Sequence, residues 1–169
     1  MTFGYPYAFE APLDRFGVGR TRKIWYTVLF LPPALAAELP FAARPRLRVE
    51  GEIAELPVEG AWMPTGDGRR YFMVSPRILK QAELAIGDMA EMRFRIADQN
   101  AVDVPPELTA GLSGDPVADA AWVTLTPGGR RGFAHLVHGA KSPETRARRV
   151  AEVLAALRDG ARSPQKKRA

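Results

Sequence analysis

A run of strand signals between residues 45 and 98 is the feature that most constrains the fold. Leu47, Val49 and Ile53 alternate with charged residues, which is the period-two pattern of a sheet with one face in water. Gly51 interrupts the alternation, and we interpret it as a β-bulge. The region therefore predicts a small, strongly curved antiparallel sheet.

The flanking residues extend this sheet. We predict strands at 3–13, 23–30, 47–53, 70–74 and 89–96, with a further strand before the turn at 65–68. Pro6 places the first strand at an edge, and the glycine-containing segment 14–19 is interpreted as a loop. Short helices are expected at 33–39 and 76–84. About six strands suffice to close a barrel, so the predicted fold class is mainly β: a small closed antiparallel β-barrel of about six strands with a C-terminal layer of short α-helices.

Four helix starts follow residue 98, and each contains proline. They are Val104-Pro105-Pro106, Asp115-Pro116, Thr126-Pro127 and Ser142-Pro143. Gly111 and Gly114 are expected to break the first helix, whereas Ser142 caps the last one and Gly160 follows its end. We thus predict a β-barrel domain over residues 1–98, a helical segment packed on it over 99–160, and a disordered basic tail over 161–169.

The net charge of +5 is distributed unevenly along the chain. Residues 1–126 hold 13 basic and 16 acidic side chains, whereas residues 127–169 hold 11 basic and 3 acidic ones. This asymmetry suggests an acidic partner such as nucleic acid, a phosphate group or an anionic surface, and solvated surface charge is the simpler alternative.

The sequence gives two indications of compartment. It contains no cysteine, which excludes disulfides, thiolate metal sites and cysteine nucleophiles and fits a reducing compartment. The uncharged run 24–37 follows three basic residues, but Pro32-Pro33 would break a membrane helix near its middle. We therefore expect a cytoplasmic protein without membrane insertion.

The order of these motifs resembles a bacterial family. Residues 9–98 resemble the domain-of-unknown-function family nineteen-oh-five, through Trp25, the run Val49-Glu50-Gly51-Glu52-Ile53, Gly66-Asp67-Gly68 and Gly87-Asp88. Residues 104–160 resemble the YdeI/OmpD-associated, or bacteriocin-protection, segment, through Val104-Pro105-Pro106-Glu107-Leu108 and the run 140–149. Ala54-Glu55 departs from the pattern, in which a second glycine is usual. The resemblance implies a fold and a name, but no reaction and no site.

The segment 141–149 is the strongest candidate for a binding site. A helix N-terminus presents free N–H groups and a partial positive charge, so Lys141 and Arg146 would form an anion site there. At about 100° per residue, Arg146 projects within the apolar stripe, Arg149 flanks it and Arg148 points away. We expect Arg146 to face the barrel and either pair with an acidic residue there or line a cleft; a purely structural salt bridge is the alternative.

The sequence gives weaker support for other kinds of functional site. Trp25, Trp62 and Tyr71 could stack on nucleic-acid bases. His135 and His138 are too few for a metal site, and the segment 127–132 lacks the lysine and Ser/Thr of a P-loop. We predict no catalytic residue, no metal and no cofactor.

Together these observations predict a non-enzymatic binding protein, or a stress- or bacteriocin-protection protein, with a cleft between the barrel and the last helix. Its partner would be an anionic small molecule or a protein. A single-stranded nucleic-acid-binding barrel is the first alternative, and an enzyme of unknown reaction is the second.

Overall fold

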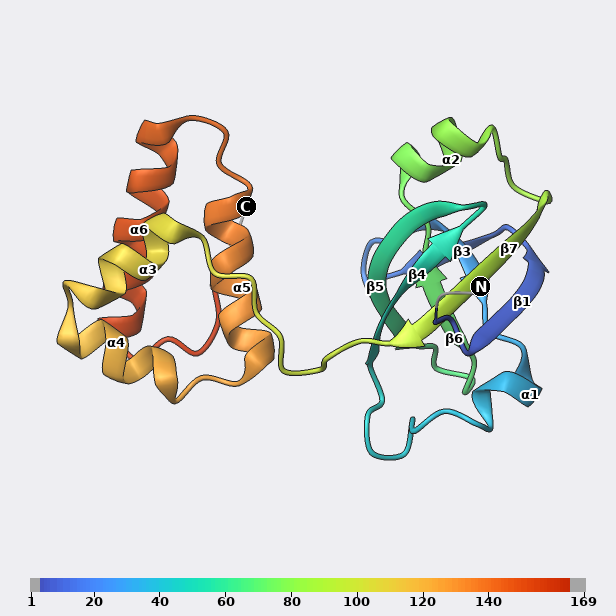
Figure 1. The fold of residues 1–169 in the computed structure, drawn as a ribbon, viewed down its shortest axis with the longest axis horizontal. Helices are drawn as coiled ribbons and strands as arrows, with labels where there is room; N and C mark the ends of the chain where they lie inside the picture. Colours follow the sequence, from blue (N-terminus) through green and yellow to red (C-terminus); the bar gives the residue numbers. More distant parts are fainter. Residues whose placement is uncertain (1–3, 165–169) are drawn as a thin grey trace. The chain divides into compact units, whose positions relative to one another are not determined.

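The computed structural model describes residues 4–164 and divides into two compact units between Gln99 and Asn100. Figure 1 shows a sheet in the first unit, coloured blue to green, and helices in the second, coloured yellow to red. Each unit has its own hydrophobic core. The chain therefore contains two centres of packing.

Seven antiparallel strands form one sheet in the first unit. They are β1 (Tyr7–Pro12), β2 (Asp14–Val18), β3 (Ile24–Phe30), β4 (Leu47–Ile53), β5 (Leu56–Pro64), β6 (Arg70–Met73) and β7 (Met89–Ile96). The order is β1-β7-β4-β5-β6-β3-β2, and within the described residues no ladder joins β1 to β2. The sheet is thus an open half-barrel. The antiparallel, mainly β prediction is confirmed, but the closed six-stranded barrel is wrong.

The additional strand is β2, which occupies the segment predicted as a loop. Its five residues pair with β3, from Asp14 opposite Val28 to Val18 opposite Ile24. The segment lacks an alternating apolar pattern because it is an edge strand with partners on one side only. The edge position predicted for the first strand is confirmed.

Gly51 lies in a regular ladder, so the predicted bulge is wrong. It pairs with Val58 on β5 and with Phe94 on β7 without a break in either register. A β-carbon at this position would lie 2.0 Å from the carbonyl oxygen of Arg93. Glycine is therefore required because the backbone of β7 approaches β4 closely where the sheet bends.

Aromatic rings fill the concave side of the sheet. Trp62 is completely buried, and its ring centroid lies 5.5 Å from that of Phe94, 5.6 Å from that of Phe72 and 5.9 Å from that of Phe9. Two short helices, α1 (Pro33–Ala36) and α2 (Pro76–Ala82), join strands that follow one another in the chain but are not adjacent in the sheet. Ser75 caps α2 by accepting a hydrogen bond from the Ile78 N–H. The buried core includes residues of β3, β4, β5, β6 and β7, and partly buried residues of β1 pack against it.

The second unit consists of the four predicted helices. They are α3 (Pro106–Ser113), α4 (Pro116–Val123), α5 (Pro127–His138) and α6 (Pro143–Arg158). The predicted caps Asp115, Thr126 and Ser142 each accept a hydrogen bond from the backbone N–H three residues later. Gly114, not Gly111, ends α3. Gly111 instead permits close packing, since a β-carbon there would lie 2.8 Å from Cγ1 of Val150.

Residues 161–164 follow α6 and lie against α5. The Ala161 N–H donates a hydrogen bond of 2.9 Å to the Ala156 carbonyl. A β-carbon on Gly129 would lie 2.5 Å from the carbonyl oxygen of Arg162, and one on Gly132 would lie 2.9 Å from Pro164. The rest of the predicted basic tail, residues 165–169, lies outside the described residues.

Candidate functional site

The N-terminus of α6 has the local structure that its sequence predicts. The Ser142 hydroxyl accepts from the Thr145 N–H at 3.1 Å, and Glu144 supplies a negative charge in the first turn. Serine and proline at these positions fix where the helix begins. Lys141 precedes the cap and is exposed, and within residues 4–164 it has no ion pair. The helix start is therefore satisfied by its own residues.

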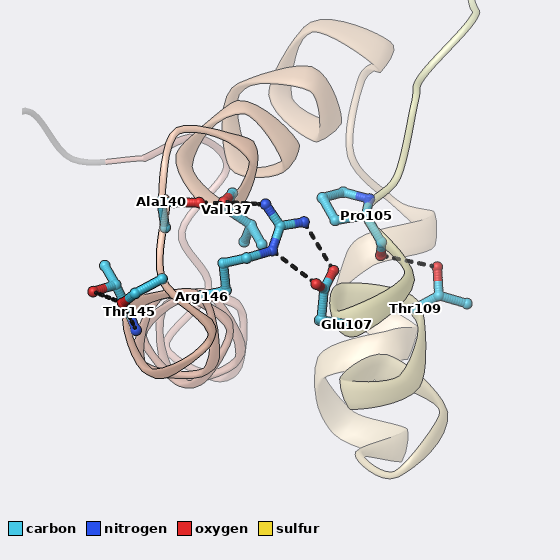
Figure 2. A network of polar contacts seen from close by, with 8 residues as sticks. Pro105, Glu107, Thr109, Val137, Ala140, Thr145 and Arg146 are labelled. Carbon is cyan, nitrogen blue, oxygen red and sulfur yellow. Dashed lines mark hydrogen bonds and ion pairs between the residues drawn. The ribbon is translucent and has the colours of Figure 1, made fainter.

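Arg146 is held by a bidentate ion pair within the helical unit, as Figure 2 shows. Its Nε donates to Glu107 Oε1 at 2.7 Å and its Nη2 donates to Glu107 Oε2 at 3.0 Å. Its Nη1 also donates to the carbonyls of Val137 and Ala140, both at 3.4 Å. The guanidinium thus joins α3, the end of α5 and α6.

This pairing changes the role expected for Arg146. Its acidic partner is Glu107 on α3, rather than a residue of the barrel, and its side chain is 23% exposed. The hydrogen bonds from Arg146 lower the pKa of the Glu107 carboxyl from 4.5 to about 2, and the backbone N–H of Glu107 contributes further. Since Glu107 is charged at neutral pH, it forms a salt bridge with Arg146 that connects α3 to α6.

A groove lies between α5 and α6, and Arg149 lines it. The groove has a volume of about 730 Å³ and is bordered by the segment after α6. Its lining residues are Phe133 and Leu136 of α5, Arg149, Glu152, Val153 and Ala156 of α6, and Asp159, Gly160, Ala161 and Pro164 beyond it. Of the three predicted site residues, Arg149 therefore belongs to a groove, whereas Arg146 and Lys141 do not line it.

The groove combines an apolar floor with a charged rim. Phe133 and Val153 are completely or almost completely buried at its base. Arg149 and Glu152 follow the helical spacing i, i+3, and Arg149 Nη1 lies 3.5 Å from Glu152 Oε2. Among residues 4–164 this is the ion pair that Arg149 makes, and its remaining guanidinium N–H groups are donors that a ligand could use. The arrangement suits a molecule with one anionic group and an apolar body.

Sequence analysis missed the α5 side of this groove. Phe133 and Leu136 lie three residues apart on the apolar face of α5. The same face supplies both the core and the floor of the groove. The spacing i, i+3 shows that the two side chains share a face, but it does not show what that face contacts.

The basic segment 127–132 forms the first turns of α5, as the predicted helix start at Thr126-Pro127 requires. Arg130 Nε donates to the Trp122 carbonyl at 3.2 Å, and its Nη2 donates to the Val123 carbonyl at 2.8 Å. Both carbonyls lie at the C-terminal end of α4, and that of Trp122 also accepts from the Leu125 N–H at 3.1 Å. The Arg130 side chain therefore links the first turn of α5 to the C-terminal end of α4.

The two histidines have separate environments. The His138 Nε2 lies 3.1 Å from the carbonyl oxygen of Asp103 and 3.4 Å from its Oδ2. Among residues 4–164, no group of three or more His, Cys, Asp or Glu side chains could hold a metal ion. The His138 contacts instead tie α5 to the segment before α3.

The predicted stacking residues differ in exposure. Trp62 is completely buried and Tyr71 is 4% exposed, so neither ring is accessible to a base. Both rings are held on the inner strands of the sheet, where packing requires them. Trp25 is 51% exposed on β3, beside the edge strand β2. Of the three, Trp25 is the residue that a ligand could reach.

No helix in the described part of the chain is long and apolar enough to cross a membrane.

The comparisons with known proteins give two matches. The family model described as Domain of unknown function (DUF1905) matches residues 9–94, and the one described as Bacteriocin-protection, YdeI or OmpD-Associated matches residues 101–160. No curated protein and no solved structure gives a significant match. The two matches lie on either side of the division between sheet and helices. With just over half of its length matched by the first, the chain belongs to the DUF1905 family, and its helical unit is a YdeI/OmpD-associated segment.

Proposed function

We propose that this protein is a non-enzymatic binding protein whose helical unit holds an organic anion in the groove between α5 and α6. The observation that supports this proposal is the position of Arg149, a guanidinium at the edge of an apolar floor with one long contact to Glu152. A charged donor beside buried Phe133 and Val153 recognises a carboxylate or phosphate that carries an apolar body.

The size of the groove supports a small ligand. A volume of about 730 Å³ falls within the range of roughly 300–1,000 Å³ found for small-molecule sites. The apolar lining from both helices would bury the body of the ligand, and burial of apolar surface supplies the main favourable term. A medium-chain fatty acid has both properties and serves as a probe.

The charged state of Glu107 makes this residue a poor general acid or base near neutral pH. A general acid or base that works near neutral pH needs a pKa close to that pH. The Glu107 carboxyl has its pKa lowered to about 2 by its hydrogen bonds with Arg146, so it stays charged and paired. The description of the matched segment as bacteriocin-protection supports a protective role, which we propose alongside binding.

The test is a thermal-shift and calorimetric titration with hexanoate, octanoate and decanoate. A ligand that binds the native state raises the melting temperature, and the shift should grow with chain length as more apolar surface is buried. The Arg149→Gln variant should bind octanoate about tenfold more weakly or worse, because it lacks the charged donor.

Arg148 offers a matched control on the same helix. Its side chain is 66% exposed and does not line the groove, and its Nε lies 3.9 Å from Glu152 Oε1, so Arg148→Gln removes the same charge beside Glu152 without removing a groove-lining side chain. Octanol, which lacks the anionic group, should give a smaller shift than octanoate. The proposal is refuted if the Arg148→Gln and Arg149→Gln variants bind octanoate with equal affinity. It is also refuted if octanoate does not raise the melting temperature of the unaltered protein.

A further inference from the structure

The hairpin of β2 and β3 presents an aromatic ring among cations at the edge of the sheet. Trp25 is 51% exposed, the Cζ of Arg15 lies 4.7 Å from its ring centroid, and the Nζ of Lys23 lies 5.7 Å from it. Register places Arg15, Gly17 and Trp25 on the same face of the hairpin. An exposed tryptophan and two cations therefore share one surface.

Gly17 leaves room for the Trp25 ring to lie against β2. It pairs with Trp25, and a β-carbon at position 17 would lie 3.2 Å from two carbons of the indole and 3.1 Å from Cδ of Lys23. A β-carbon here would force the indole to shift by a few tenths of an ångström. The glycine thus lets the ring cover the backbone of β2 and limits its movement, which lowers the entropy lost when a ligand stacks on it.

The cations of the hairpin are not neutralised by carboxylates. Arg15, Arg20, Arg22 and Lys23 are exposed or half-exposed, and none has an ion pair within the described residues. The one acidic residue of the hairpin is Asp14, whose Oδ1 accepts a hydrogen bond from the Arg15 N–H. By contrast, Arg93 and Arg95 on β7 pair with glutamates of the sheet. The β2–β3 edge therefore carries four cations that no carboxylate of the described residues pairs with.

We propose that this hairpin face, made of Arg15, Gly17, Lys23 and Trp25 with Arg20 and Arg22 in the adjoining loop, binds single-stranded nucleic acid. A base would stack on Trp25, and the cations would contact the neighbouring phosphates. Stacking on an aromatic ring together with phosphate contacts is how small β-sheet proteins hold single strands without reading their sequence. This site lies in the sheet unit and is independent of the helical groove.

A membrane surface is the competing partner, since Ile24 is 58% exposed on the opposite face of β3. The position of the charges disfavours it. The loop at the tip of the hairpin contains Arg20 and Arg22, so insertion would bury these charges before any apolar side chain. A flexible polyanion meets no such penalty, because its phosphates contact the tip while a base contacts the ring.

The experiment measures fluorescence anisotropy of a labelled oligothymidylate of about 20 nucleotides with the full chain. The Trp25→Ala variant should bind about tenfold more weakly, and Trp25→Phe should retain most of the affinity because it keeps an aromatic face. In the Arg22→Gln/Lys23→Gln variant, the slope of log affinity against log salt should fall by about 1.4, which corresponds to two phosphate contacts.

Controls separate this site from other sources of binding. The Arg77→Gln/Lys80→Gln variant removes two charges from α2 and should bind as the unaltered protein does. Thermal unfolding verifies that each variant is folded. The proposal is overturned if the Trp25→Ala variant binds the oligonucleotide with unchanged affinity, or if affinity is lost only in a variant lacking residues 165–169. It is also overturned if the protein binds vesicles of phosphatidylcholine with about one-third phosphatidylserine but does not bind the oligonucleotide.

Discussion

Replacement of Gly51 by alanine tests how tightly the half-barrel bends. The added β-carbon would lie 2.0 Å from the Arg93 carbonyl oxygen and 2.7 Å from Cα of Phe94. Both atoms belong to the backbone of β7, so no side-chain rotation relieves the overlap. The two strands must move apart by about 1 Å to reach the shortest tolerated contact.

The cost of this movement is estimated from the interactions that it disrupts. Gly51 and Phe94 are opposite each other in the ladder, and a shift of this size breaks roughly two backbone hydrogen bonds at about 1 kcal/mol each. Phe94 is fully buried, and displacing a packed core residue costs about 1–3 kcal/mol more. We therefore expect a loss of about 3–5 kcal/mol and a melting temperature lower by at least about 12 °C.

Fluorescence of Trp62 reports on the sheet unit. A background in which Trp25 and Trp122 are replaced by phenylalanine leaves Trp62 as the remaining tryptophan, in the core of the sheet. Gly66→Ala is the matched control because no atom lies within 4 Å of its added β-carbon. A Gly51→Ala variant that melts within about 2 °C of this control would show that β4 and β7 separate freely, contrary to the reasoning.

Two further predictions concern the helical unit. The pKa of Glu107 is about 2 in the folded protein against 4.5 ordinarily, so its ion pair with Arg146 stabilises the fold above about pH 4.5 and this contribution is lost as the pH falls towards 2. The free energy of unfolding measured in urea should decline over this pH window. In the Glu107→Gln variant, the decline should be smaller by the contribution of the ion pair. If the variant and the unaltered protein show the same dependence of stability on pH, the proposed role of the ion pair is contradicted. Ser142→Ala removes the cap of α6 and should cost about 1 kcal/mol, whereas Ser142→Asp should restore most of it; equal stability of the three proteins would show that the Thr145 N–H needs no side-chain partner.

Local signals in the chain predicted the helices of the second unit well. Asp115, Thr126 and Ser142 each precede a proline, and each caps a helix as expected. A cap bonds to an N–H three residues away, so its effect is contained in the local sequence. The alternation from Leu47 to Ile53 likewise predicted a strand, because one face of that strand is buried along its whole length.

The errors arose where a distant segment determines the local structure. β2 is a strand because β3 pairs with it, and its own residues show no alternation. Gly51 resembled a bulge, but the approach of β7 explains it. In both cases the deciding contact lies across the sheet, where neither propensity nor spacing in the sequence records it.

The candidate sites follow the same division. Composition and helical spacing established which residues carry charge, that Arg148 and Arg149 point to different sides of α6, and that a cap begins the helix at Ser142. The packed fold was needed to show that Arg146 pairs with Glu107, 39 residues away, that Arg149 borders a groove, and that Trp25 is exposed while Trp62 is buried. Helical spacing fixes the direction of a side chain, whereas its partner and its exposure depend on which surface the fold brings against it.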